Sequence, residues 1–288
     1  MQKQHTTPAE LAALVPAGWQ TGHILTDDGI CLHYTRTGSD KPSLLLVHGH
    51  MMSGVTWLRT AQALQADFDV IMPDLRGHGR SGDPTTGYTM DLLAADLHAL
   101  ITALALENPR VIGHSNGAEA VITLAAAQPD MFTQIILEEP PFMPPPAPDA
   151  PGYSAWYAGW LQGMQALQAE TDFSVQLEQV RALAGPWLVG WDDADFITYA
   201  DAQVRFRLAV NELMGGYSPR TTDADMLRQV TAPVLLITGQ PFPPGIGDPV
   251  AAMMAALPNG QHQHIEGAGH GVHVTQLTAF LGAVRSVL

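Results

Sequence analysis

Residues 110–120 read RVIGHSNGAEA, and this stretch constrains the fold of the chain more than any other. A short apolar run ends at Gly113, a sharp turn follows, and a helical pattern begins after Gly117. Glycines on both sides of Ser115 keep the crowded backbones of such a turn from colliding. The turn lifts the serine hydroxyl to the amino end of a helix, where N–H groups favour an anion. The alternative is a serine that only caps a helix in a glycine-rich turn.

Short apolar runs alternate with longer helical patterns along most of the chain, and this alternation predicts an α/β fold. The mostly parallel sheet is expected to carry helices on both faces. The strand-like segments are 23–38 (a hairpin around Asp28-Gly29), 43–49, 68–75, 110–115, 134–139, 234–239 and 261–267. Apolar residues three and four apart indicate helices at 57–66, 89–106, 117–128, 248–258 and 274–288.

The alternation stops after Glu139, where a proline-rich segment begins that neither strand nor helix can accommodate. About ninety residues then show helical patterns without a convincing strand, until the sheet resumes near Pro233. We therefore predict a core formed by residues 1–139 and 229–288, interrupted by an inserted helical cap at 140–228.

Composition excludes several classes of function. The chain has 288 residues, 46% of them hydrophobic, and a formal net charge of −15, so phosphate backbones and anionic membrane surfaces are repelled at long range. No apolar stretch is long enough to span a bilayer, and the amino terminus lacks a secretory leader, so a cytoplasmic location is expected. The single cysteine, Cys31, excludes an internal disulfide framework. We expect no nucleic-acid or membrane partner, and the oligomeric state stays open, a homodimer included.

A second strand-like run, residues 43–49, ends in His48-Gly49-His50. Acyl transfer needs two backbone N–H donors for the developing oxyanion, one after the nucleophile and one from the loop after an earlier strand. Asn116 and His50 occupy these places. A metal site at His48 and His50 is the alternative, but no acidic or thiol ligand is nearby, so we predict no metal and a structural role for His48.

The third candidate motif, GAGHGVHV, follows the last strand-like segment. His270 lies between two glycines on a loop that can bring an imidazole over the sheet edge. It also follows Ser115 in the chain order that this arrangement requires. His273 is the alternative histidine, but it lies at the start of the final helical pattern, where we expect a capping or surface role.

Together, HGHMMSG, MPDLRGHGRS (from Asp74 to Ser81), GHSNG and GAGH resemble the α/β-hydrolase superfamily over residues 18–288. The resemblance implies an α/β-hydrolase fold with a Ser–His–acid triad and no cofactor. A serine nucleophile differs from the aspartate of the haloalkane dehalogenase and epoxide hydrolase branches. The enzyme classes that remain possible are esterases, lactonases, thioesterases, amidases, carbon–carbon bond hydrolases and perhydrolases. The fold alone does not distinguish among them.

The acid of the triad is the least usual feature. Most members of the superfamily resembled here place it soon after the glycine that ends the seventh strand, but this chain has Phe242 there. Asp248, before Pro249, looks like a helix cap. Some members place the acid after the sixth strand, and zearalenone-type lactonases are similar in a Glu-x-Pro step that selects Glu139. We predict Glu139 as the acid, with Asp248 and Glu138 as alternatives, because the ends of neighbouring strands converge.

Aromatic side chains are concentrated in the predicted cap and suggest an apolar pocket. Packing of the cap onto the core is the alternative explanation. The predicted pocket residues are Met51, Phe142, Trp156, Trp160, Trp187 and Trp191. We therefore expect a serine hydrolase that cleaves a carboxylic ester or lactone of a medium-sized apolar molecule. The alternatives are a carbon–carbon bond hydrolase and a non-catalytic small-molecule-binding protein of this fold.

Overall fold

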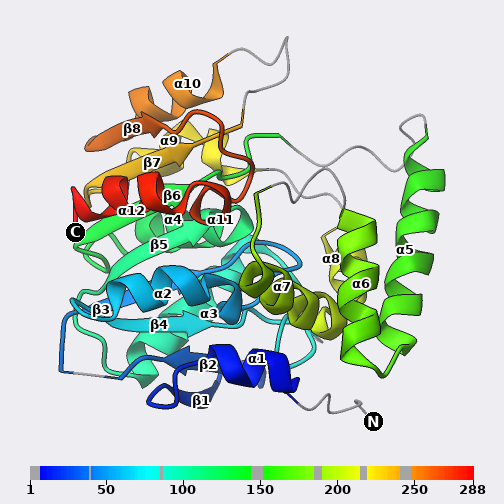
Figure 1. Cartoon of the computed structure of the whole chain (residues 1–288). Coiled ribbons are helices and arrows are strands. Elements are labelled where there is room, and N and C mark those ends of the chain that lie inside the picture. Colours follow the sequence, from blue (N-terminus) through cyan, green and yellow to red (C-terminus); the bar gives the residue numbers. More distant parts are fainter. Residues whose placement is uncertain are drawn as a thin grey trace.

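A single sheet of eight strands organises the computed structural model, which describes residues 7–38, 40–84, 87–143, 152–184, 190–214, 219–240 and 248–288 (Figure 1). The spatial order of the strands is β1-β2-β4-β3-β5-β6-β7-β8. Their bounds are β1 (Gln20–Leu25), β2 (Cys31–Arg36), β3 (Ser43–Val47), β4 (Asp69–Pro73), β5 (Arg110–His114), β6 (Gln134–Glu138), β7 (Val234–Thr238) and β8 (Gly260–His264). The predicted hairpin segment 23–38 covers β2 and the end of β1, and each of the other strand-like segments coincides with one strand to within a few residues.

The sheet is antiparallel only at its first edge. β1 and β2 form the expected hairpin, with Gly29 in the left-handed region at φ +85°, and β2 pairs antiparallel with β4. Every other neighbouring pair is parallel. The central strands are buried on both faces, as parallel strands beneath two layers of helices must be.

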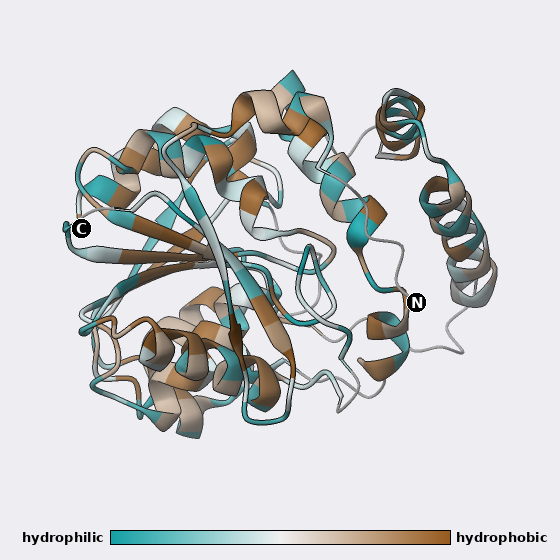
Figure 2. Cartoon of the chain, turned by 90° about the horizontal axis from the view of Figure 1, so that it is seen from below, coloured by the Kyte–Doolittle hydropathy of each residue, from teal (hydrophilic) through white to brown (hydrophobic). Residues whose placement is uncertain are grey.

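Helices cover both faces of this sheet, as Figure 2 shows, and the prediction of an α/β fold is confirmed. One face is covered by α3 (Met90–Ala103), α4 (Asn116–Ala127), α9 (Ala224–Leu227) and α10 (Pro249–Ala256). The other is covered by the 3₁₀ turn η1 (Gly54–Trp57) and by α2 (Leu58–Leu64), α11 (Val272–Thr275) and α12 (Leu277–Arg285). A short helix near the amino terminus, α1 (Ala9–Leu14), was not expected from the sequence.

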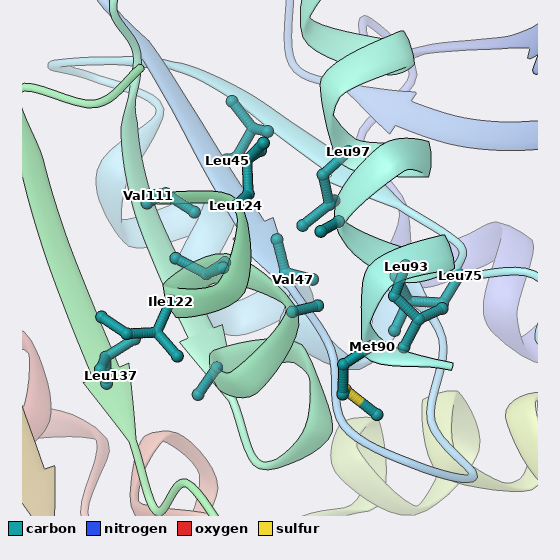
Figure 3. Close-up of a cluster of buried hydrophobic side chains, with 14 of the residues drawn as sticks. Leu45, Val47, Leu75, Met90, Leu93, Leu97, Val111, Ile122, Leu124 and Leu137 are labelled. Atoms are coloured by element: carbon teal, nitrogen blue, oxygen red, sulfur yellow. The ribbon is translucent and has the colours of Figure 1, made fainter. Parts of the chain in front are cut away.

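The side chains of each strand alternate between the two faces of the sheet, and this alternation divides the core into two clusters. Leu45 and Val47 of β3 face α3 and α4, with Val111 and Leu137 of the next two strands beside them (Figure 3). Leu44 and Leu46, on the opposite face, belong to the cluster under α2 and α12. Alternate residues of a strand point to opposite faces, so the four consecutive apolar residues Leu44 to Val47 make β3 buried on both sides.

The described residues between β6 and β7 form helices and no strand. Four of these helices lie beyond one side of the sheet and are called the inserted helices (Figure 1). They are α5 (Tyr153–Ala169), α6 (Phe173–Ala184), α7 (Asp193–Arg205) and α8 (Ala209–Leu213). Their buried side chains are continuous with the core cluster under α3 and α4. The following turn η3 (Arg220–Thr222) and α9 instead contact α4 and α10.

None of the helices in the described ranges combines the length and the apolar character that crossing a membrane requires.

Candidate active site

The parallel strands β3, β5, β6 and β7 end at the same edge of the sheet. His114 at the end of β5 is in register with Glu138 of β6, which is in register with Ile237 of β7. The residues that follow these strands are therefore neighbours in space, although they are far apart in the chain. His50, Ser115 and Glu139 follow three of these strands and His270 follows β8, whereas Glu138 ends β6, Asn116 begins α4 and Asp248 lies at the start of α10.

Ser115 occupies a strained turn between β5 and α4. Its backbone has φ +52° and ψ −123°, a conformation that residues other than glycine rarely adopt. Its N–H donates to the carbonyl oxygen of Glu138 at 2.9 Å. Cβ atoms on Gly113 and Gly117 would collide with the backbone of Ala118 and with the carbonyl of His48, respectively. The glycines thus permit the close approach of β3, β5 and α4 that forms the turn.

Glu139 is a second strained residue, with φ +46° immediately after β6. Its Oε1 accepts hydrogen bonds from the backbone N–H groups of Gly239 at 2.5 Å and Gln240 at 3.0 Å. The other carboxylate oxygen, Oε2, lies 3.6 Å from Nδ1 of His270. The Glu139 side chain is 7% exposed and that of His270 is 48% exposed. The loop after β7 therefore orients the carboxylate, leaving one oxygen toward an accessible imidazole.

Glu138 forms a separate, deeper pair with His273. The Nδ1 atom of His273 lies 2.8 Å from Oε2 of Glu138, and the backbone N–H of His273 donates to Oε1 at 2.8 Å. Burial alone would raise the pKa of Glu138, but electrostatic interactions with the His273 and His114 rings and hydrogen bonds from His273 lower it below its usual value. Trp57 stacks on the His273 ring at 4.0 Å between centroids. The interpretation of His273 as a capping or surface residue is wrong, because it is 3% exposed and bonded to β6.

His114 connects the serine turn to the loop after β8. Its Nε2 donates to the carbonyl oxygen of His270 at 2.9 Å, and the two rings are 4.8 Å apart. Burial lowers the pKa of His114 to about 3, so the ring is neutral near pH 7. The bond from His114 and the bond between His273 and Glu138 hold the backbone at His270 and just after it. Sequence reasoning missed both contacts, since the only available signal was the Glu-Glu pair at the end of an apolar run.

The loop after β3 presents the backbone N–H of His50. Nδ1 of His48 donates to the carbonyl oxygen of Gly49 at 2.7 Å, and Nε2 accepts from the Leu75 N–H at 2.9 Å. In a trans peptide the N–H points away from the carbonyl, so fixing the Gly49 carbonyl directs the His50 N–H to the side away from His48. Asn116, the other predicted donor, is the first residue of α4.

The other acid candidate lies elsewhere. Asp248 is exposed and caps α10, where its side chain accepts from the Ala251 N–H at 2.9 Å. Two residues named in the sequence arguments, Phe242 and Trp187, lie outside the described residues. Within the described ranges no three potential metal ligands gather in one place.

The predicted pocket residues differ in their surroundings. Met51, Phe142 and Trp160 are partly buried against the core cluster under α3 and α4, and Trp160 stacks with Tyr157 at 5.6 Å. Trp191 packs edge-on against Tyr199 at 5.2 Å. Trp156 is 61% exposed. Of the described pocket candidates, Trp156 is therefore mostly exposed to solvent.

An open hollow at the other end of the sheet is separate from this site. It is lined by residues before β5 and β6, among them Leu106, Asn108, Pro129 and Asp130. Strands β5 and β6 run from these residues toward Ser115 and Glu139, so the hollow faces the opposite edge.

Three comparisons with known proteins bear on this site. A family model described as alpha/beta hydrolase fold matches residues 42–276. An N-formylmaleamate deformylase of Pseudomonas putida is 28% identical over 93% of this chain and 96% of its own. A soluble epoxide hydrolase of Corynebacterium is 34% identical over 41% of each chain. The crystal structure of an N-formylmaleamic acid deformylase from Pseudomonas putida is 26% identical, with a TM-score of 0.74 over 92% of this chain and 100% of that one.

Proposed function

This chain belongs to the alpha/beta hydrolase fold family, and from that premise we propose that it is a serine hydrolase for a carboxylic ester or lactone of a medium-sized apolar molecule. One observation carries the proposal. Ser115, with its backbone strained at φ +52°, directly follows β5, and Glu139 directly follows the neighbouring strand β6. Glu139 in turn lies 3.6 Å from His270. Strain of this kind persists where the surrounding structure enforces it, and it is concentrated at functional sites.

The proposed reaction proceeds in two steps. Oγ of Ser115 attacks the carbonyl carbon while Nε2 of His270 takes the hydroxyl proton, and the backbone N–H groups of His50 and Asn116 hold the oxyanion. His270 then returns the proton to the departing alkoxide, leaving an acyl-enzyme. Water, deprotonated by the same imidazole, attacks this ester and releases the acid and the free serine. Glu139 holds His270 in the tautomer with a proton on Nδ1.

The separation of Glu139 and His270 is consistent with this role. At 3.6 Å the pair is slightly longer than a hydrogen bond. Catalytic hydrogen bonds are often long in the absence of substrate and shorten in the reacting complex. Since Oε1 of Glu139 is already bonded to the loop after β7, rotation of the exposed His270 ring is the movement that closes the gap.

A second candidate is hydrolysis of an amide or formyl group. The match to an N-formylmaleamate deformylase extends over 93% of this chain, which favours this reaction class. The same Ser115, His270 and oxyanion donors serve both classes, because each proceeds through a tetrahedral intermediate. They differ in the leaving group, to which His270 must deliver a proton.

A fluorophosphonate probe tests the proposal. We expect the folded protein to be labelled at Ser115, and both labelling and turnover to disappear in Ser115→Ala. Folded wild-type protein that takes up no label would contradict a serine hydrolase. Turnover of p-nitrophenyl esters, lactones and N-formyl amides of similar size then separates the two candidate classes.

A further inference from the structure

The inserted helices contact the loop that carries one of the proposed oxyanion donors. Asn211, on α8, lies with its Oδ1 atom 2.7 Å from Nε2 of His50, so the imidazole donates to the amide oxygen. An oxyanion donor contributes to catalysis only when it is held in place before the reaction begins. A bond from another segment to the side chain of His50 is therefore a bond to the donor residue itself.

A second bond holds the next residue of the same loop. Nε2 of Gln203, near the end of α7, donates to the carbonyl oxygen of Met51 at 2.6 Å. Met51 has φ +61°, and its N–H donates to Nε2 of His78 at 3.1 Å. The unusual backbone of Met51 is thus fixed on one side by the core and on the other by an inserted helix. A positive φ at a residue other than glycine requires such support.

Packing reinforces the two bonds. The ring of Phe206 lies between α7 and α8, 5.0 Å from the ring of His50 in an edge-on arrangement and 4.9 Å from that of His78. Phe206 is 2% exposed and Gln203 is 4% exposed. The Arg207 N–H donates to the carbonyl oxygen of Gly77 at 2.9 Å. The segment from Gln203 to Asn211 is therefore anchored to two loops of the core.

The residue after the nucleophile is reached as well. Nδ2 of Asn116 lies 4.0 Å from the sulfur of Met214, which follows α8. Asn116 is only 6% exposed, so this sulfur is part of its immediate surroundings. Both proposed oxyanion donors consequently contact the same short stretch of the inserted segment.

We propose that two parts of the inserted segment, the carboxyl end of α7 and the helix α8, position the oxyanion donors. Asn211 is the positioning residue for His50, and Gln203 is the positioning residue for Met51. The inference rests on the proposed function. It assigns to the inserted helices a part in transition-state stabilisation, which is distinct from covering the substrate. An interaction of this kind affects kcat rather than KM, because it supports a group that bonds fully only to the transition state.

Asn211→Leu tests the inference, because leucine has a similar shape and no acceptor. We expect kcat to fall about tenfold with KM changed by less than about twofold, a smaller loss than deletion of an oxyanion donor causes. Gln203→Leu, which removes the other bond, is expected to act in the same way. Glu212→Gln is the matched control, since Glu212 is an exposed residue of the same helix.

A double-mutant cycle separates positioning from general loss of structure. If Asn211 acts through the His50 side chain, Asn211→Leu costs little further activity in a His50→Ala background. The inference would be overturned if Asn211→Leu reduced kcat equally in the wild-type and His50→Ala backgrounds, or if it changed only KM. An effect on kcat no larger than that of Glu212→Gln would overturn it as well. Wild-type protein without Ser115-dependent labelling would instead overturn the proposed function, so the two failures are distinguishable.

Discussion

Glu138 and Glu139 are consecutive residues with separate histidine partners. Glu138 ends β6 and points to the face where His273 is buried, whereas Glu139 follows the strand with φ +46° and faces His270. Strand alternation requires that at most one of two neighbours face a given side. The positive φ of Glu139 then directs its carboxylate toward the edge of the sheet. Two adjacent acids at the end of one strand can therefore have different roles.

Glu139→Gln is expected to reduce kcat by a factor on the order of 10² to 10⁴ while the protein stays folded. Glutamine cannot stabilise the imidazolium formed at His270, and it can favour the wrong tautomer. Steady-state kinetics on a p-nitrophenyl ester measures the loss. Asp248→Asn is the control, because Asp248 only caps α10, and it should retain nearly full kcat. The reverse order of the two losses would identify Asp248 as the acid.

Glu138→Gln is expected to act chiefly on stability, lowering the free energy of unfolding by about 2 kcal/mol at neutral pH, since a charge-assisted buried bond to His273 is lost. The folded-state pKa of Glu138 lies below the usual 4.5, so its contribution is present above pH 4.5 and is lost as the pH falls through the folded pKa. Urea unfolding at neutral and acid pH measures both effects. Equal midpoints for variant and wild type at neutral pH would contradict a stabilising pair.

At the scale of the elements, the loops that end β3, β4 and β5 depend on buried neutral histidines. His48, His50 and His78 lie ring against ring, and His114 supports the serine turn. Burial lowers the pKa of all four, that of His50 to about 4 and that of His114 to about 3. Each ring is thus held uncharged, and nitrogens of His48, His78 and His114 bond neighbouring peptide groups.

These histidines predict acid sensitivity. The unfolded chain binds protons below about pH 6.5, whereas the folded protein does not until the lowered pKa is reached. These histidines therefore do not reduce the free energy of unfolding above pH 6.5. Below that pH the free energy of unfolding falls, by up to about 1.4 kcal/mol per pH unit for each histidine. Urea unfolding at a series of pH values measures the slope. His114→Gln should reduce the slope, while the variant of an exposed histidine, His23→Gln, should leave it unchanged.

At the scale of the whole molecule, negative charge is in excess and most arginines are already paired. The net charge is −15, and Arg59 and Arg80, for example, pair with Asp195 and Asp201 beside the inserted helices. An arginine held by a carboxylate offers little to an anionic substrate, and the net charge repels such a substrate at long range. Both effects favour uncharged substrates.

We expect a neutral diester to be hydrolysed with a kcat/KM at least about tenfold above that of the matching half-ester, with the difference narrowing as salt screens the charges. Matched pairs of equal chain length, such as diethyl and monoethyl succinate, provide the measurement. Preference for the half-ester would show that a cationic group receives the substrate, and it would favour the deformylase-like candidate.

The sequence by itself determined the local features. The strands, the core helices, the serine turn and the hairpin at Gly29 follow from apolar period, glycine placement and turn residues, all of which act over a few neighbouring positions. The nearness of the turn at Ser115 to Glu139 also follows, because neighbouring parallel strands end at the same side of the sheet. His270 was predicted from its place between two glycines and its position after the serine in the chain, and it lies 3.6 Å from Glu139.

Only the tertiary structure decided which side chains meet. The partners of His273, Asn211 and Gln203 are 135, 161 and 152 residues away in the chain. No local pattern reports such a contact, because its free energy depends on burial and geometry that exist only after the sheet and the inserted helices have packed. The motifs therefore gave the candidate site residues, while packing determined how the backbone around them is held.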